Sequence, residues 1–183
     1  MPTVFSHPAP ALCLGLALGR NAVSPRLLFA GLACSVLPDL DVIGFSYGIS
    51  YGEALGHRGL SHSLLFAFCT GLCAFIAAPL LKARRGVAFL FCGGAVLTHI
   101  LLDAMTTGGL GVALYWPWSE DRFFLPRRPI AVSPFALERL FSERGIRVFT
   151  SELYWVWLPS LAGAAGVLLW RAALSVFKKP RRL

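Results

Sequence analysis

Residues 86–105, GVAFLFCGGAVLTHILLDAM, are the most informative segment of this 183-residue chain. A helix needs about 20 mostly apolar residues to cross a hydrocarbon core of roughly 30 Å, and this segment meets that requirement. Its ionisable side chains, His99 and Asp103, stand four residues apart near the C-terminal end and so share one helix face. The segment therefore predicts a membrane-spanning helix with a polar pair toward one end.

The rest of the chain extends this pattern. Hydrophobic residues make up 56% of the sequence and charged residues 14%, a balance that favours a membrane protein over a soluble domain. The first of the other apolar segments is short, and the second contains PDLD at residues 38–41, which should interrupt its helix. These other segments are residues 8–19, 27–45, 63–81 and 153–170.

We therefore expect an all-α fold, a polytopic membrane helix bundle of about five spans or part-spans, of which the last three are long enough to cross. Residues 108–152 are mixed in charge and punctuated by proline, and should fold over the outer face of the bundle. No repeat or linker divides the chain, so residues 1–183 should form one membrane-embedded domain. Its site region is expected in residues 1–130, and its outer segment and final span in residues 108–183.

Charge predicts the orientation of this bundle. The turns after the first, third and fifth apolar segments hold basic residues and no acid, so the positive-inside rule places them and the C-terminus in the cytoplasm. All nine acidic residues then fall toward the outer side. The formal net charge of +8 is thus a sign of topology and of contact with lipid headgroups, and no nucleic-acid partner is expected.

Ionisable residues from four segments fall at similar depths. At 1.5 Å per helical residue from the cytoplasmic ends, Asp39 and His7 lie at roughly 18 Å and His99 at about 20 Å. Asp103 follows at about 26 Å and His62 at about 28 Å. Every histidine and three carboxylates should therefore meet in the outer half of the bilayer.

Such a cluster favours a metal centre. Buried histidines and carboxylates cost several kcal/mol unless they are paired or metal-bound. They are also the ligands that Zn²⁺, Mn²⁺ and Fe²⁺ accept. We predict one or two divalent ions, zinc foremost, with manganese or iron as alternatives. The predicted ligands are His7, Asp39, Asp41, His57, His62, His99 and Asp103.

Neighbouring residues have predicted roles around this centre. Gly59 should let the backbone turn so that His57 folds back toward the cluster, and Ser61 is expected to cap the next helix. Arg58 could neutralise a phosphate oxygen of a substrate, and Arg122 is a second candidate for substrate binding. Asp41, or another carboxylate, is the candidate acceptor of a proton from water. The five cysteines lie in apolar segments and lack the spacing of a metal motif.

These elements resemble a known family. LPDLD (37–41), GHRGLSHSLL (56–65) and LTHILLDAMTTGG (97–109) resemble the YdjM-like family of membrane-bound, metal-dependent hydrolases, and the likeness runs from His7 to about Ile130. Ser61 stands where the family commonly has threonine, so the hydroxyl is kept. The resemblance implies a multi-pass inner-membrane hydrolase. The HxxxD element also resembles the multi-zinc phospholipase C and nuclease group, which suggests phosphoester chemistry.

Several function classes remain open at this stage. A hydrolase with a recessed outer-facing site would act on a phosphoester or a lipid-linked, amphipathic substrate. A transporter of metal ions or protons needs ionisable groups on both sides of the midplane, which the cytoplasmic halves lack. Haem binding is disfavoured by the acid one turn from His99. A non-catalytic, metal-stabilised protein stays an alternative, and the oligomeric state is left open.

Overall fold

The computed structural model describes residues 1–133 and 142–177. Over these residues the chain is helical, with two isolated β-bridges and no strand, which confirms the all-α prediction. The elements are α1 (Ala9–Leu18), α2 (Pro25–Val36), the 3₁₀-helices η1 (Leu37–Tyr47) and η2 (Leu60–His62), α3 (Leu64–Ile76), α4 (Arg85–Ala104), α5 (Glu143–Glu152), the π-helical turn η4 (Leu153–Trp157) and α6 (Leu158–Phe177).

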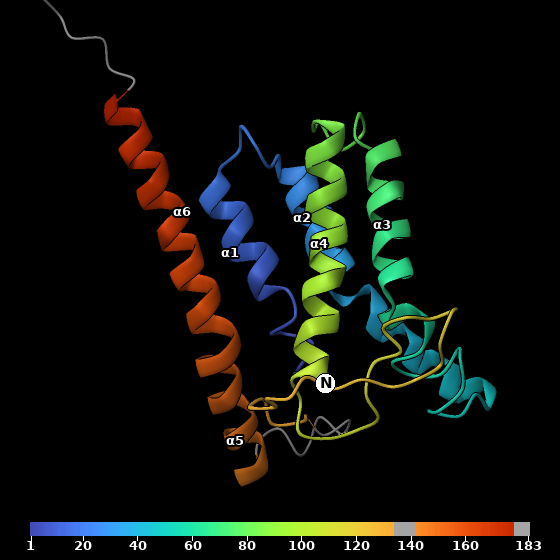
Figure 1. Cartoon of the computed structure of the whole chain (residues 1–183). Coiled ribbons are helices and arrows are strands. Elements are labelled where there is room, and N and C mark those ends of the chain that lie inside the picture. The colour runs from blue at the N-terminus through green and yellow to red at the C-terminus, as the bar shows by residue number, and fades with distance from the viewer. Residues whose placement is uncertain (134–141, 178–183) are drawn as a thin grey trace, which may run out of the picture.

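Helix α4 is the centre of the bundle. It packs against α3 and α2, while α1 lies between α4 and the tilted α6 at the edge (Figure 1). The turns after α1 and α3 lie at one end of the bundle. The segment that follows α4 crosses the opposite end, next to the C-terminal part of α4 that carries His99 and Asp103.

Three helical stretches are long and apolar enough to cross a membrane: Pro25–Tyr47, Arg85–Ala104 and Glu143–Ser175. The second apolar segment is therefore not broken by its proline. Pro38 stands in the first turn of η1, where a missing N–H is tolerated, so the helix tightens instead of ending. The third segment is shorter than expected: α3 ends at Ile76, ahead of Pro79, and is too short to span by itself.

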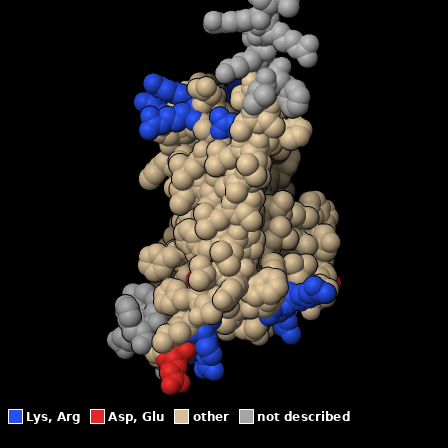
Figure 2. Space-filling model, turned by 90° about the vertical axis from the view of Figure 1, so that its left-hand side faces the viewer, with Lys and Arg blue, Asp and Glu red and all other residues tan. Residues whose placement is uncertain are grey.

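The two ends of the bundle differ in polarity. On the face shown in Figure 2, one end carries lysine and arginine without acid, and the other carries both signs. Near the basic end the buried core is apolar and packs around Leu27, Phe91 and Cys92. Gly31 makes this packing close, because a Cβ there would lie 2.3 Å from the Phe91 ring.

The outer segment predicted from residues 108–152 covers the end opposite the basic turns. Backbone hydrogen bonds fasten it: Ala113 N donates to Arg58 O, Leu64 N to Leu114 O, and Leu125 N to Ala104 O. Residues 134–141 of this segment lie outside the described residues. The segment therefore closes over the end of α4 that carries His99 and Asp103.

Candidate metal centre

Five predicted ligands from four parts of the chain converge. The Nε2 atom of His7 lies 3.7 Å from Asp39 Oδ2 and 3.6 Å from Asp103 Oδ1. The Nε2 atom of His62 lies 3.3 Å from Asp103 Oδ2, and that of His99 lies 3.5 Å from Asp39 Oδ1. Four of these residues, Asp39, His62, His99 and Asp103, offer ligand atoms that are all within 4.8 Å of one another.

This cluster is almost completely enclosed. The side chains of the three histidines and of Asp103 are 0% exposed, and that of Asp39 is 8% exposed. The oxygens of both carboxylates, and both ring nitrogens of His7, make no well-aligned hydrogen bond. Arg58 lies beside Asp103, but the remaining carboxylate oxygens and the imidazole nitrogens face one another, and a divalent cation would satisfy both kinds of group together. The donor set therefore fits a metal ion.

The outward-facing nitrogens of two histidines have their own partners. His99 Nδ1 lies 2.7 Å from the carbonyl oxygen of Ser35. Because a carbonyl only accepts, Nδ1 must carry the hydrogen of the neutral ring. Nε2 then carries no hydrogen, and its lone pair points toward the cluster. His62 Nδ1 lies 3.2 Å from Asp41 Oδ2, so its Nε2 is likewise directed inward. Partners of this kind orient metal-binding histidines.

Asp41 is the hub of a second, adjoining group. Its Oδ1 lies 2.6 Å from His57 Nδ1, and its Oδ2 accepts from Arg58 N (3.1 Å) and from Ser61 Oγ (2.5 Å). Asp41, His57 and His62 also meet the geometric requirement for holding an ion. The two groups share His62 through its opposite nitrogens, so both a one-ion and a two-ion centre fit these residues.

The GHRG turn brings these side chains together. A Cβ at Gly56 would lie 2.1 Å from Ser50 O, and one at Gly59 would lie 2.2 Å from Ala54 O, so both positions need glycine. Arg58 adopts a positive φ of 65° between them. The expected cap at Ser61 was wrong: Ser63 caps α3 by accepting from Phe66 N, which leaves the Ser61 hydroxyl for Asp41.

Arg58 is fully buried beside Asp103. Its Nε lies 2.9 Å from Asp103 Oδ2, and its Nη2 donates to Thr106 Oγ1. Its Nη1 donates to the carbonyl oxygens of Gly108 (3.2 Å) and Leu110 (3.0 Å). The guanidinium thus joins a candidate ligand to the outer segment, and its contact with a substrate stays a prediction.

Arg122 reaches the same region from the outer segment. Its guanidinium donates to the carbonyl oxygens of His57, Gly52 and Glu53 and so holds the loop that leads into the GHRG turn. Partial burial lowers the pKa of Arg122, which still remains a cation at neutral pH. Its predicted role in substrate binding also stays a prediction.

Glu152 is a buried acid that the sequence did not single out. It is 1% exposed and accepts hydrogen bonds from the backbone and hydroxyl of Thr3 and from Ser6 Oγ. Trp157 Nε1 donates to the same serine hydroxyl. These bonds anchor the segment that carries His7, whose ring stacks on His99 at 3.7 Å between centroids. The only local signal is an acid directly ahead of an apolar run.

Comparison with known proteins identifies similar inner membrane proteins. The chain matches the family described as YdjM inner membrane protein over residues 1–177. It is 49% identical over 172 residues to the inner membrane protein YbcI of Escherichia coli (strain K12), an alignment that covers 93% of this chain and 99% of that protein. No solved structure matches it. The chain therefore belongs to the YdjM family of inner membrane proteins.

Proposed function

We propose that this membrane protein is a metal-dependent hydrolase that cleaves a phosphoester or another lipid-linked ester at the outer face of the membrane. The observation that carries the proposal is the ligand set: two imidazoles and two carboxylates, from His62, His99, Asp39 and Asp103, offer ligand atoms within 4.8 Å of one another, and the His7 imidazole adjoins both carboxylates. Structural zinc sites are built mainly from cysteine, whereas hydrolytic zinc centres use histidine and carboxylate ligands. All five cysteines of this chain stand outside the cluster.

Some of these residues would bind the metal ion directly, and others orient the side chains that bind it. His7, Asp39, His62, His99 and Asp103 would hold the ion, with Zn²⁺ foremost and Mn²⁺ or Fe²⁺ as alternatives. Such an ion supplies Lewis acidity, which activates water and polarises the bond to be cut. Asp41 and the Ser35 carbonyl orient two of the imidazoles. A second ion at Asp41, His57 and His62 is the two-ion form of the proposal, in which metal ligation would replace the contacts of Asp41 with the two rings.

A proton acceptor is also needed for hydrolysis. Asp41 is predicted for this role, but its carboxylate already accepts three hydrogen bonds, which occupy both of its oxygens. Asp39 makes no well-aligned hydrogen bond and borders the accessible surface. We therefore add Asp39 as a second candidate for this role.

The proposed orientation places the centre on the outer side. The basic turns lie at the end of the bundle opposite the centre, and the positive-inside rule assigns such turns to the cytoplasm. Transport is less well supported, because the buried core near those turns, around Leu27 and Phe91, holds no histidine or carboxylate among the described residues.

A second candidate function is a non-catalytic protein that a metal ion stabilises. The near-complete burial of all five donors favours it, since a catalytic ion keeps an open position. The two candidates predict the same metal content and differ in turnover.

The test is metal analysis and ester hydrolysis with protein purified in detergent. We expect about one or two ions per chain in the unmodified protein. His99→Ala should lose both the metal and the hydrolysis of phosphoester lipids. Asp121→Asn, which changes an exposed acid of the outer segment, is the matched control and should retain both. A metal-loaded protein that cleaves none of the tested esters would favour the non-catalytic candidate.

A further inference from the structure

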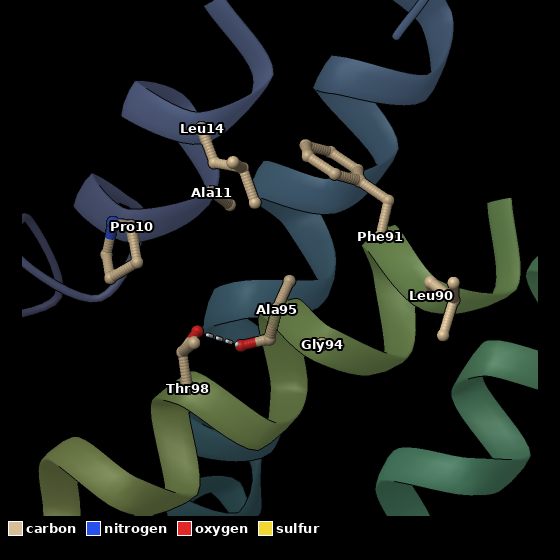
Figure 3. A pocket seen from close by; sticks show the side chains of 8 residues that line it. All are labelled: Pro10, Ala11, Leu14, Leu90, Phe91, Gly94, Ala95 and Thr98. Carbon is tan, nitrogen blue, oxygen red and sulfur yellow. Dashed lines mark hydrogen bonds between the residues drawn. The ribbon is translucent and has the colours of Figure 1, made fainter. Parts of the chain in front are cut away.

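Two adjoining cavities form a groove along the side of the bundle. The first, of about 130 Å³, lies between α1 and α4 and is lined by apolar side chains that include Ala11 and Leu14 (Figure 3). The second, of about 320 Å³, continues toward η4 and α6 past Leu101 and Trp155. Both cavities are lined by Pro10 and Thr98, so together they form one lateral groove.

The lateral groove has the length of one membrane leaflet. It extends along α4 from Leu90 to Leu101, about 16 Å at 1.5 Å per helical residue. Half of a hydrocarbon core of roughly 30 Å is about 15 Å. The Phe91 ring lies at the inner end of the groove, packed against Gly15 and Gly31 of α1 and α2.

The groove opens toward lipid tails. Helix α4 is long and apolar enough to span, and rim residues of the groove are exposed, Leu90 by 71% and Leu101 by 42%. No charged side chain lines either cavity. Water and polar ligands are therefore poor occupants, and a hydrocarbon chain is the ligand whose chemistry fits.

The groove also runs directly beside the metal centre. Thr98 lines the groove and its neighbour His99 faces the cluster; Pro10 lines the groove and His7 lies three residues before it. The rings of His7 and His99 stack on each other, and each histidine is close in sequence to a residue that lines the groove. Leu102, at the outer part of the groove, adjoins Asp103.

We propose that the lateral groove seats a single linear acyl chain of a lipid substrate, with the ester-bearing end of that chain at the depth of Asp103. The proposal rests on the hydrolase function proposed above. Lipid tails are as apolar as leucine, so the groove gains little affinity from burial. Its contribution is position, because it holds one chain in a fixed register beside the centre.

Gly94 offers a direct way to block the groove. It lines the first cavity, and a Cβ at this position would meet nothing within 4 Å, so Gly94→Leu fills the groove without displacing the backbone. Leu14→Trp fills it from the α1 side. Gly166→Leu is the matched control, since Gly166 of α6 is equally open and lines neither cavity.

The test uses full-length protein in nanodiscs of phosphatidylethanolamine and phosphatidylglycerol that carry a diazirine within one acyl chain. After illumination, mass spectrometry should locate adducts mainly on residues 10–14 and 90–98. We expect at least roughly a tenfold loss of these adducts in Gly94→Leu and in Leu14→Trp. The control Gly166→Leu should keep its adducts at the level of the unmodified protein. Adducts spread evenly over the lipid-facing helices, with no effect of Gly94→Leu, would overturn the proposal. So would labelling of the groove by a diazirine polyprenyl phosphate but not by the acyl probe.

Hydrolysis is measured in parallel, so that the two proposals can fail separately. Gly94→Leu should lower hydrolysis of long-chain lipid esters by roughly tenfold while sparing short-chain, soluble esters and leaving the metal content unchanged. If the adducts depend on Gly94 but no ester is cleaved, binding of an acyl chain in the lateral groove is supported and the hydrolase function is contradicted. If Gly94→Leu cleaves esters equally well and its adducts are unchanged, acyl-chain binding in the groove is contradicted and the hydrolase function is supported.

Discussion

Asp103 is the side chain through which the metal centre is joined to the rest of the molecule. Its Oδ1 faces His7, its Oδ2 faces both His62 and Arg58, and the side chain is fully buried. Arg58 in turn holds carbonyl groups of the outer segment. A change at either member of this pair should therefore alter both metal binding and folding.

Asp103→Asn is expected to lose metal and stability together. The amide cannot balance Arg58 or a bound cation, and leaving a buried charge uncompensated costs on the order of 3–5 kcal/mol. Metal content by mass spectrometry and unfolding in denaturant measure the two effects. Asp121→Asn is the exposed control. Full metal content in Asp103→Asn would remove this residue from the ligand set.

Arg58→Ala is expected to lower the free energy of unfolding by about 3–5 kcal/mol, because Asp103 then lacks its balancing cation. A bound metal ion supplies positive charge at the same carboxylate, so the loss should be smaller in metal-loaded protein than in metal-free protein. Unfolding curves with and without metal test this. An unchanged stability in both states would mean that Arg58 is free for substrate and that its contacts here contribute little.

At the scale of elements, the sequence predicted the helices and their ligand-bearing positions better than the contacts between distant segments. The HxxxD spacing on α4 follows from helical periodicity, and counting residues from the basic turns brought the ligands to one end of the bundle, although His62 lies in η2 and not on α3. The Glu152 anchor and the Arg58 contacts join residues that are distant in sequence, and no local pattern marks such pairs. The length of α3 was overestimated, because hydropathy does not register where Pro79 stops a helix.

The N-terminal segment depends on the Glu152 anchor. Glu152→Gln removes the negative charge and one of the two oxygens that accept from Thr3 and Ser6, so His7 should be held less firmly. We expect metal affinity to fall by roughly 10–100-fold, as for other outer-shell changes. Competition with a chelator measures it. Glu143→Gln, an exposed acid on the same helix, should keep full affinity.

The GHRG turn tolerates no side chain at Gly59. A Cβ there would clash with Ala54 O, so Gly59→Ala must move the loop that carries His57 and His62. We expect at least roughly tenfold weaker metal binding. Gly52→Ala is the control, because its Cβ would lie 3.9 Å from the nearest atom. Equal affinity in the two variants would show that the turn can shift without disturbing the centre.

At the scale of the whole molecule, the separation of the basic turns from the ligand-bearing end has a topological consequence. We expect Ser119→Cys, in the outer segment, to react with an impermeant thiol reagent in intact cells. Lys82→Cys, in the turn between α3 and α4, should react only after the membrane is opened. Both variants are made in a cysteine-free background. The reverse pattern would place the centre on the cytoplasmic side.

The anchor between Ser6 and Glu152 joins residues 146 positions apart, and this sets an order for biogenesis. At about 5–20 residues per second, a ribosome needs roughly 7–30 s to make the chain between them. During that interval His7 has already been synthesised, whereas Glu152, which anchors its segment, has not. Maturation of the centre must therefore wait for the last hydrophobic helix to enter the bilayer. A nascent chain arrested before that helix should be inserted in the membrane but should hold its ion less tightly than the full-length chain.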